Sequence, residues 1–438
     1  MSACAWAEPV SSPPVYPSER YRGPAGDLAP ASVAARPYWG LVSRNVVMLG
    51  LTSLFTDISS ESLSAVLPLY FMLELRMTPL QFGLLDGLYQ GSSALVRVAG
   101  GLVADAGRRY KAVAFVGYAL SAFCKLGLLL VGSAWAPLAA LLTLDRAGKG
   151  VRTAPRDALI TLSSEPSRLG EAFGAHRAMD TVGAVLGPLL AVGVLAAAPG
   201  AYDAVFVASF AVALVGLAVL VLFVDNPSER PGIATRDSRP HLRIRATFAS
   251  QRFRALVAAG GALSLLTASD ALIYLVLQRR GAVPPTLFPL LFVGTAVVYL
   301  LLALPAGRLA DRWGRHRVFL AGHGLVLCIY LILLASTLPA PAIAACVGLL
   351  GAYYAATDGV LSALASSVLR EEQLTTGLAV VSTTTGVSRL LASSLFGALW
   401  SWRGPTDALV IFAIGLVVAT ATAAGLLRIG RPWIAAVE

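Results

Sequence analysis

The chain has 438 residues, of which 57% are hydrophobic and only 13% are charged, and its mean hydropathy is +0.73. Soluble domains carry about 25% charged residues, so this composition excludes a soluble globular protein and indicates an integral membrane protein. The formal net charge of +10 is therefore expected to report membrane topology rather than nucleic-acid binding.

The N-terminal segment, residues 1–43, is rich in proline and lacks the apolar core with a basic flank that defines a signal peptide. It is predicted to be a disordered cytoplasmic tail.

Twelve apolar runs follow, each long enough to supply the roughly 20 residues that a helix needs to cross the hydrocarbon core. They cover approximately residues 45–71, 79–104, 111–133, 137–160, 172–197, 202–224, 255–278, 286–310, 318–338, 341–369, 374–401 and 406–427. The prediction is an all-α membrane protein of twelve transmembrane helices. Its predicted parts are an N-terminal six-helix bundle (44–224), a cytoplasmic central loop (225–254), a C-terminal six-helix bundle (255–428) and a cytoplasmic tail (429–438).

The arginines between these runs lie almost entirely on one side of the membrane if both termini are placed in the cytoplasm. The opposite side then carries only Arg76, Arg279, Arg280 and Arg403. Because positively charged loops stay in the cytoplasm, this bias predicts an even number of spans with both ends inside.

Two carboxylates lie near the middle of the first predicted span. Asp57 and Glu61 are one helical turn apart and share a face. A carboxylate at this depth is costly unless it is protonated, paired or hydrated. Reversible protonation is the chemistry of a proton-coupled carrier, and we favour a functional interpretation for these two residues.

Further ionisable residues lie within other predicted spans. They are Asp86 and Arg97, Lys125, Arg146, Asp180, Asp270, Asp358 and Arg389. Ionisable residues inside a membrane are candidates for a functional site by default. The alternative is a structural ion pair, for example Arg97 or Lys125 neutralising Asp57, Glu61 or Asp86, and the sequence leaves both interpretations open.

The loop after the eighth span, from Gly307 to Arg317, reads Gly-Arg-Leu-Ala-Asp-Arg-Trp-Gly-Arg-His-Arg, and a divergent copy follows the second span. This run resembles the loop motif G-x-L-A-D-R-x-G-R-x-R/K of the major facilitator superfamily, in which it locks the outward-facing state through Asp–Arg and helix-dipole contacts. The residues that match in the two copies are Gly101, Asp105, Arg108, Arg109, Gly307, Asp311, Arg312, Gly314, Arg315 and Arg317. The alternative is that the arginines only set topology.

The fifth span contains Gly174, Gly183, Gly187 and Pro188, and resembles the antiporter motif of the same superfamily without its final glycine pair. Simple helix packing is the alternative, since small residues four apart are common in membrane helices. Arg146 in the fourth span resembles the arginine that the superfamily ties to proton coupling. The D-x-S-S-E of the first span, from Asp57 to Glu61, resembles a bacterial branch of the superfamily.

The resemblance implies two six-helix bundles that rock about a central cavity. The leading hypothesis is a proton-coupled antiporter in the bacterial cytoplasmic membrane that exports a small organic molecule, a drug or a metabolite of amphipathic or cationic character. Asp57 and Glu61 would alternate between proton and substrate. The proton gradient would drive transport, and we expect a functional monomer whose partners are the substrate and the lipid bilayer, with no nucleic acid.

The first alternative is proton symport that imports an organic anion, which would be bound by Arg97, Lys125, Arg146 and Arg389. A more distant alternative is a non-transporting receptor or an intramembrane enzyme. The spans hold no nucleophile–base constellation, and neither the cysteines nor the histidines have metal-site spacing. We therefore expect no enzymatic activity, no metal and no cofactor.

Overall fold

The computed structural model describes residues 42–107, 109–165, 168–226, 248–370 and 373–428, and within them all regular structure is helical. Most of the predicted N-terminal tail and central loop, the predicted C-terminal tail and Arg108 lie outside the described residues. The first half contains α1 (Arg44–Leu69), η2 (Tyr70–Glu74), α2 (Pro79–Gly107), α3 (Tyr110–Val131), α4 (Trp135–Leu162), α5 (Leu169–Ala197) and α6 (Tyr202–Phe223). The second half contains α8 (Gln251–Leu265), α9 (Asp270–Gly281), η4 (Pro285–Leu287), α10 (Leu290–Trp313), α11 (Arg315–Leu333), α12 (Ala340–Ser366), α13 (Leu374–Arg403) and α14 (Pro405–Arg428).

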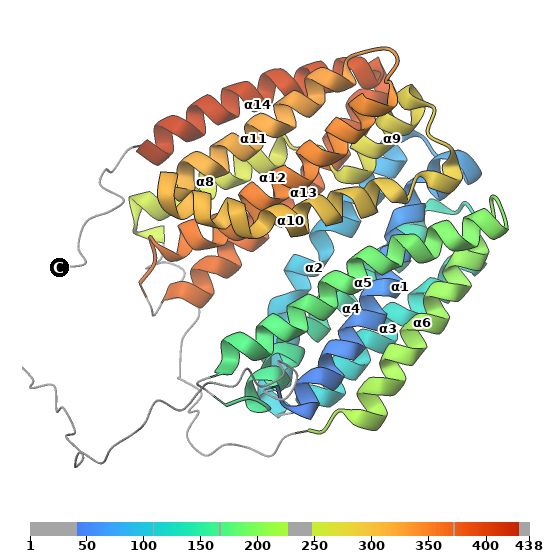
Figure 1. The fold of residues 1–438 in the computed structure, drawn as a ribbon, viewed down its shortest axis with the longest axis vertical. Coiled ribbons are helices and arrows are strands. Elements are labelled where there is room, and N and C mark those ends of the chain that lie inside the picture. Colours follow the sequence, from blue (N-terminus) through green and yellow to red (C-terminus); the bar gives the residue numbers. More distant parts are fainter. Residues whose placement is uncertain (1–41, 108, 166–167, 227–247, 371–372, 429–438) are drawn as a thin grey trace, which may run out of the picture. The chain divides into compact units, whose positions relative to one another are not determined.

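The two sets of helices pack by the same scheme (Figure 1). In the first half, α1 packs against α5 and α6, α2 against α4, and α3 against α4 and α6. In the second half, α8 packs against α13 and α14, α10 against α12, and α11 against α12 and α14. This correspondence agrees with the repeated loop motif in the sequence.

The halves meet where α2 packs along α13 and α5 along α10. Gly83, Gly87 and Gly91 lie one turn apart on the face of α2 that contacts α13. A methyl group at Gly87 would lie 2.6 Å from the carbonyl oxygen of Leu390, and one at Gly397 would meet the backbone of α2. Small residues at this spacing allow the two helix backbones to approach closely.

The seventh predicted run is not one continuous helix, because residues 266–269 separate α8 from α9. Tyr330 of α11 satisfies the exposed backbone: its hydroxyl accepts from Ala268 N at 2.7 Å and donates to Leu266 O at 3.0 Å. Ser269 caps α9, since its side chain accepts from the backbone N–H of Leu272. The break places the start of α9 inside the protein.

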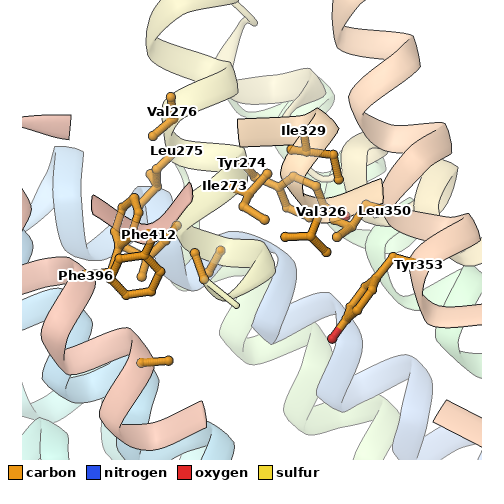
Figure 2. Close-up of a cluster of buried hydrophobic side chains, with 14 of the residues drawn as sticks. Ile273, Tyr274, Leu275, Val276, Val326, Ile329, Leu350, Tyr353, Phe396 and Phe412 are labelled. Atoms are coloured by element: carbon orange, nitrogen blue, oxygen red, sulfur yellow. The ribbon is translucent and has the colours of Figure 1, made fainter. Parts of the chain in front are cut away.

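Helix α9 is enclosed by its neighbours over residues 271–277, all of which are buried. Figure 2 shows its side chains among those of the surrounding helices, with Ile329 of α11 near Tyr274, and Phe396 and Phe412 near Leu275. A helix that is apolar on all sides needs such a complete enclosure.

Eight helical segments among the described residues are long and apolar enough to cross a membrane. They are Tyr110–Val131, Leu169–Ala197, Tyr202–Phe223, Gln251–Gly281, Pro285–Trp313, Arg315–Leu333, Ala340–Ser366 and Pro405–Leu427. Helices α1, α2, α4 and α13 fall outside this set, and the first three of them supply most of the polar cavity described next.

Candidate functional site

A cavity of ≈ 230 Å³ lies between the two halves. Its ionisable lining residues are Glu61 of α1, Asp86 of α2, Arg146 and Lys149 of α4, and Asp270 of α9. Aromatic and apolar side chains complete the wall, among them Phe71, Phe82, Leu85, Tyr89, Leu142 and Phe292. Four of the residues predicted from sequence therefore share one cavity.

Two carboxylates of the cavity are held by hydroxyl groups from the second half. Ser393 donates to Asp86 at 2.7 Å, so this bond crosses between the halves. Tyr354 donates to Asp270, which also lies in the first turn of α9, where the positive end of a helix dipole favours an anion. Glu61 accepts from Ser64 at 3.0 Å.

No ion pair between described side chains includes Glu61, Asp86, Asp270 or Lys149. Arg146, in contrast, is neutralised by its sequence neighbour, because two of its nitrogens donate to Asp145 at 2.6 and 2.8 Å. The cavity thus offers three carboxylates and one ammonium that have no ion-pair partner among the side chains that the structure describes.

The placement of Lys125 corrects the sequence-based interpretation. Lys125 is fully buried behind the cavity wall, and its Nζ lies 3.7 Å from Asp145 Oδ1. Asp145 also accepts from Ser121 at 2.6 Å. Lys125 therefore neutralises neither Asp57, Glu61 nor Asp86. Lys125 is not among the residues that line the cavity, and its ion-pair partner is Asp145 on the adjacent helix.

The guanidinium of Arg146 lies over the ring of Tyr89, 3.9 Å from its centroid. This cation–π contact and the bonds to Asp145 fix the side chain at the cavity wall. Arg146 is only 5% exposed, so it shapes the cavity more than it offers a free positive charge.

Asp57 has different surroundings from Glu61, although they lie one turn apart. Asp57 Oδ1 is 3.6 Å from Arg152 Nη2, and Asp57 does not line the cavity. Arg152 in turn lies over the ring of Tyr118. The two carboxylates predicted to act together are thus divided between the cavity and a neighbouring charged cluster.

The glycines of the fifth span explain how these carboxylates are positioned. A methyl group at Gly183 would lie 3.0 Å from Asp57 Cβ, and one at Gly187 would lie 2.8 Å from Glu61 Cβ. The two glycines therefore let α5 pack directly on the acidic face of α1. Gly174 has open space at the corresponding position, so no close packing is found there. Pro188 is buried within α5.

Asp358 of α12 and Arg389 of α13 form an ion pair at 3.7 Å and do not line the cavity. An anionic substrate would therefore have to compete with Asp358 for Arg389. The side chain of Arg97 lies outside the described part of the structure, although its backbone is within α2.

In the second-half loop motif, Asp311 in the last turn of α10 pairs with Arg315 in the first turn of α11. Asp311 Oδ1 is 3.1 Å from Arg315 Nη2, and Arg315 donates to the Ala363 carbonyl in the last turn of α12. A cation at a helix C-terminus is stabilised by the helix dipole. Gly314 has φ 97°, a left-handed conformation that glycine adopts without strain.

The remaining residues of the motif are described only in part. Arg312 and Arg317 are exposed, and a methyl group at Gly307 would meet open space. In the first-half copy, Gly101 and Asp105 belong to α2 and are described by their backbone alone, and Arg108 lies outside the described residues altogether. Arg109 is exposed at the N-cap of α3.

Sequence reasoning missed several residues of the site, chiefly Lys149, Asp145 and Arg152 of α4. Their spacing gives a usable signal, because residues 145, 149, 152 and 156 recur at intervals of three or four and so share one helix face. Tyr354 and Ser393 carry no comparable signal, since hydroxyl side chains are ordinary in membrane helices.

A charged cavity between two similarly packed sets of apolar helices defines a membrane transport protein rather than an enzyme. The comparisons with known proteins agree. Residues 49–282 and 271–437 match the family model of the Major Facilitator Superfamily. The chain belongs to the Major Facilitator Superfamily.

Relatives and solved structures show the same likeness. The chain is 29% identical over 368 residues to an uncharacterized MFS-type transporter of Methanocaldococcus jannaschii, covering 82% of this chain and 89% of the relative. A protein of Mycobacterium tuberculosis is 31% identical over 181 residues, covering 41% of this chain and 44% of that protein.

Among solved structures, a mutant of the nucleoside transporter NupG has a TM-score of 0.76 at 13% identity, covering 87% of this chain and 100% of that one. A POT family transporter in complex with 5-aminolevulinic acid has a TM-score of 0.73 at 13% identity, covering 88% of this chain and 96% of that one. At these identities the likeness concerns the fold.

Proposed function

We propose that the protein is a proton-coupled antiporter that exports a small organic cation. The observation that carries this proposal is the charge of the cavity. Glu61, Asp86 and Asp270 have no ion-pair partner among the described side chains, whereas the cavity cation Arg146 is already neutralised by Asp145. Among the described residues that line the cavity, Lys149 is the cation left to offset these three carboxylates.

Carboxylates enclosed by apolar helices are stabilised by a bound cation or by a proton. If both compete for the same carboxylates, release of one accompanies binding of the other, and this competition is the basis of exchange. Asp86 and Asp270 lie at the contact between the halves, so their occupancy can bias which side of the cavity opens.

The cavity volume favours a small metabolite over a large drug. Sites for drug-sized ligands measure about 300–1,000 Å³, and this cavity measures ≈ 230 Å³. Its aromatic wall residues suit an organic cation, because aromatic faces attract positive charge.

The proposal includes twelve membrane spans with both termini in the bacterial cytoplasm, and a monomer as the functional unit. In that orientation the α2–α13 contact lies on the extracytoplasmic side. The halves would alternate between this contact and a contact on the cytoplasmic side, where the Asp311–Arg315 pair lies.

Import of an organic anion by symport is the second candidate, and Lys149 is the residue that supports it. Of the other cations, Lys125 and Arg146 share Asp145, and Arg389 pairs with Asp358. The cavity as a whole therefore suits an anion less well than a cation.

A flux assay separates the candidates. Proteoliposomes with a pH-sensitive dye inside are given small ammonium compounds or small carboxylates in turn. We expect ammonium compounds to dissipate an imposed pH gradient, and Asp270→Asn to abolish this flux. The matched control is Asp203→Asn, an exposed residue at the start of α6. Gradient-dependent flux with carboxylates alone would contradict export of a cation.

A further inference from the structure

A second group of charged side chains lies beside the cavity, where α1, α3, α4 and α5 meet. It contains two ion-pair sets: Asp57 of α1 with Arg152 of α4, and Asp180 of α5 with Arg156 of α4 and His176 of α5. We call these five residues the α5 cluster. None of them lines the cavity.

Asp180 contacts two basic side chains of the α5 cluster. Its Oδ2 lies 3.9 Å from Arg156 and 3.4 Å from His176 Nδ1. Arg156 is committed elsewhere, because two of its nitrogens donate to Asp157 at 2.8 and 3.0 Å. Asp57 faces the same side of α5, because its Cβ would lie 3.0 Å from a methyl group at Gly183, three residues along the helix from Asp180.

Three atoms of the α5 cluster are buried without a hydrogen-bond partner: Asp180 Oδ1, His176 Nε2 and Arg152 Nη1. Arg152 and His176 are only 3% and 1% exposed. A buried polar atom without a partner costs roughly 1–3 kcal/mol, a cost that hydration of these three atoms would offset. The carboxylate oxygen of Asp180 can accept a hydrogen bond from water, and the nitrogen atom of Arg152 can donate one. Water bound between such groups can also carry a proton.

We propose that Asp57 and Asp180 form a second proton-binding site, separate from the substrate cavity, in which ordered water shares one proton between the two carboxylates. The proposal deepens the proposed antiport and rests on it, because it names where a coupling proton resides. Arg152 and Arg156 are the counter-ions that hold the pair when the proton leaves.

The surroundings of the α5 cluster contain few other ionisable groups. Tyr118 of α3 contacts Ser53 and lies under Arg152, Asp157 lies on α4, and Arg177 on α5. Glu61 of α1 and Lys149 of α4 lie one turn further along, in the cavity wall. The ionisable residues of α6, Tyr202 and Asp203, lie in its first turn. The ionisable residues of α10 form no described ion pair with the α5 cluster.

Infrared difference spectroscopy tests this site without a substrate. The full chain in lipid bilayers is titrated with acid while the carbonyl stretch of protonated carboxyl groups is recorded. We expect Asp180→Asn to remove one titration step and Asp57→Asn to displace the same step. Asp203→Asn, which changes an exposed acid in the first turn of α6, should leave that step unchanged.

Glu61→Gln separates this inference from the proposed function. It should remove a different step and abolish cation-dependent flux while the Asp180 step remains. Survival of the wild-type step in Asp180→Asn and in Asp57→Asn would overturn the second proton site, whatever the flux assay shows. Should Asp180→Asn fail to fold, an unchanged step in Asp57→Asn alone overturns it.

Discussion

Replacement of Asp145 by asparagine should destabilise the protein strongly. Lys125 is 0% and Asp145 is 2% exposed, so the substitution leaves a buried ammonium without its carboxylate. Removing one partner of a buried pair costs about 3–5 kcal/mol, which is roughly 100-fold to several-thousand-fold in the unfolding equilibrium. Arg146 retains its contact with Tyr89, but it also loses its anionic partner.

The assay is unfolding by denaturant in detergent micelles, followed by tryptophan fluorescence. The double variant Lys125→Met with Asp145→Asn should regain part of the loss, because the unpaired ammonium is gone. Glu165→Gln is the control: Glu165 pairs with Arg168 at 3.9 Å while 72% exposed, and its loss should cost at most about 1 kcal/mol. A cost for Asp145→Asn as small as that of the control would refute the buried pair.

Three further predictions concern the helix contacts. Gly187→Val should cost about 1–3 kcal/mol of unfolding free energy, because the added side chain would overpack against Ile58 and Glu61. Gly193→Ala on the same helix should be nearly neutral, because a methyl group there meets no other atom. Equal effects of the two variants would count against the α1–α5 packing. Tyr330→Phe should cost about 1–3 kcal/mol, because the buried N–H of Ala268 loses its acceptor; an unchanged melting temperature would contradict this. Arg280→Gln should lower the melting temperature more than Arg279→Gln. Arg280 donates to the carbonyls of Leu333 and Ala335 at the end of α11 and to Thr406, whereas Arg279 is exposed. The reverse order of melting temperatures would disprove the role of Arg280 at the end of α11.

Hydropathy alone predicts the helices well, because a membrane span must be long, apolar and internally hydrogen-bonded. Each of the twelve predicted runs overlaps a helix or, in the seventh, a pair of helices. The break in the seventh run is missed because its residues are apolar or small. Ser269 followed by Asp270 is nevertheless a helix-start signal in the sequence.

The pairing of the charges is less accessible from sequence. Spacing shows that Asp57 and Glu61 share a helix face. It does not show that Asp57 pairs with Arg152 of another helix while Glu61 lines the cavity. Such choices depend on how each helix is rotated about its axis. That rotation is set by contacts such as Gly183 and Gly187 against α1, which only the tertiary structure resolves.

The central claim is that the α2–α13 contact must open for the cavity to release its cargo. At its edge the backbone N–H of Leu80 donates to Ser401 Oγ at 2.8 Å, which brings the two residues close enough to test for a disulfide between introduced cysteines, its formation being checked by thiol titration. The background variant replaces the native cysteines by serine at Cys4, Cys124, Cys328 and Cys346. Oxidation of Leu80→Cys with Ser401→Cys should stop gradient-dependent flux of ammonium compounds, and reduction should restore it, while each single variant transports normally. Full flux through the oxidised double variant would show that this contact stays closed during transport and would contradict the account.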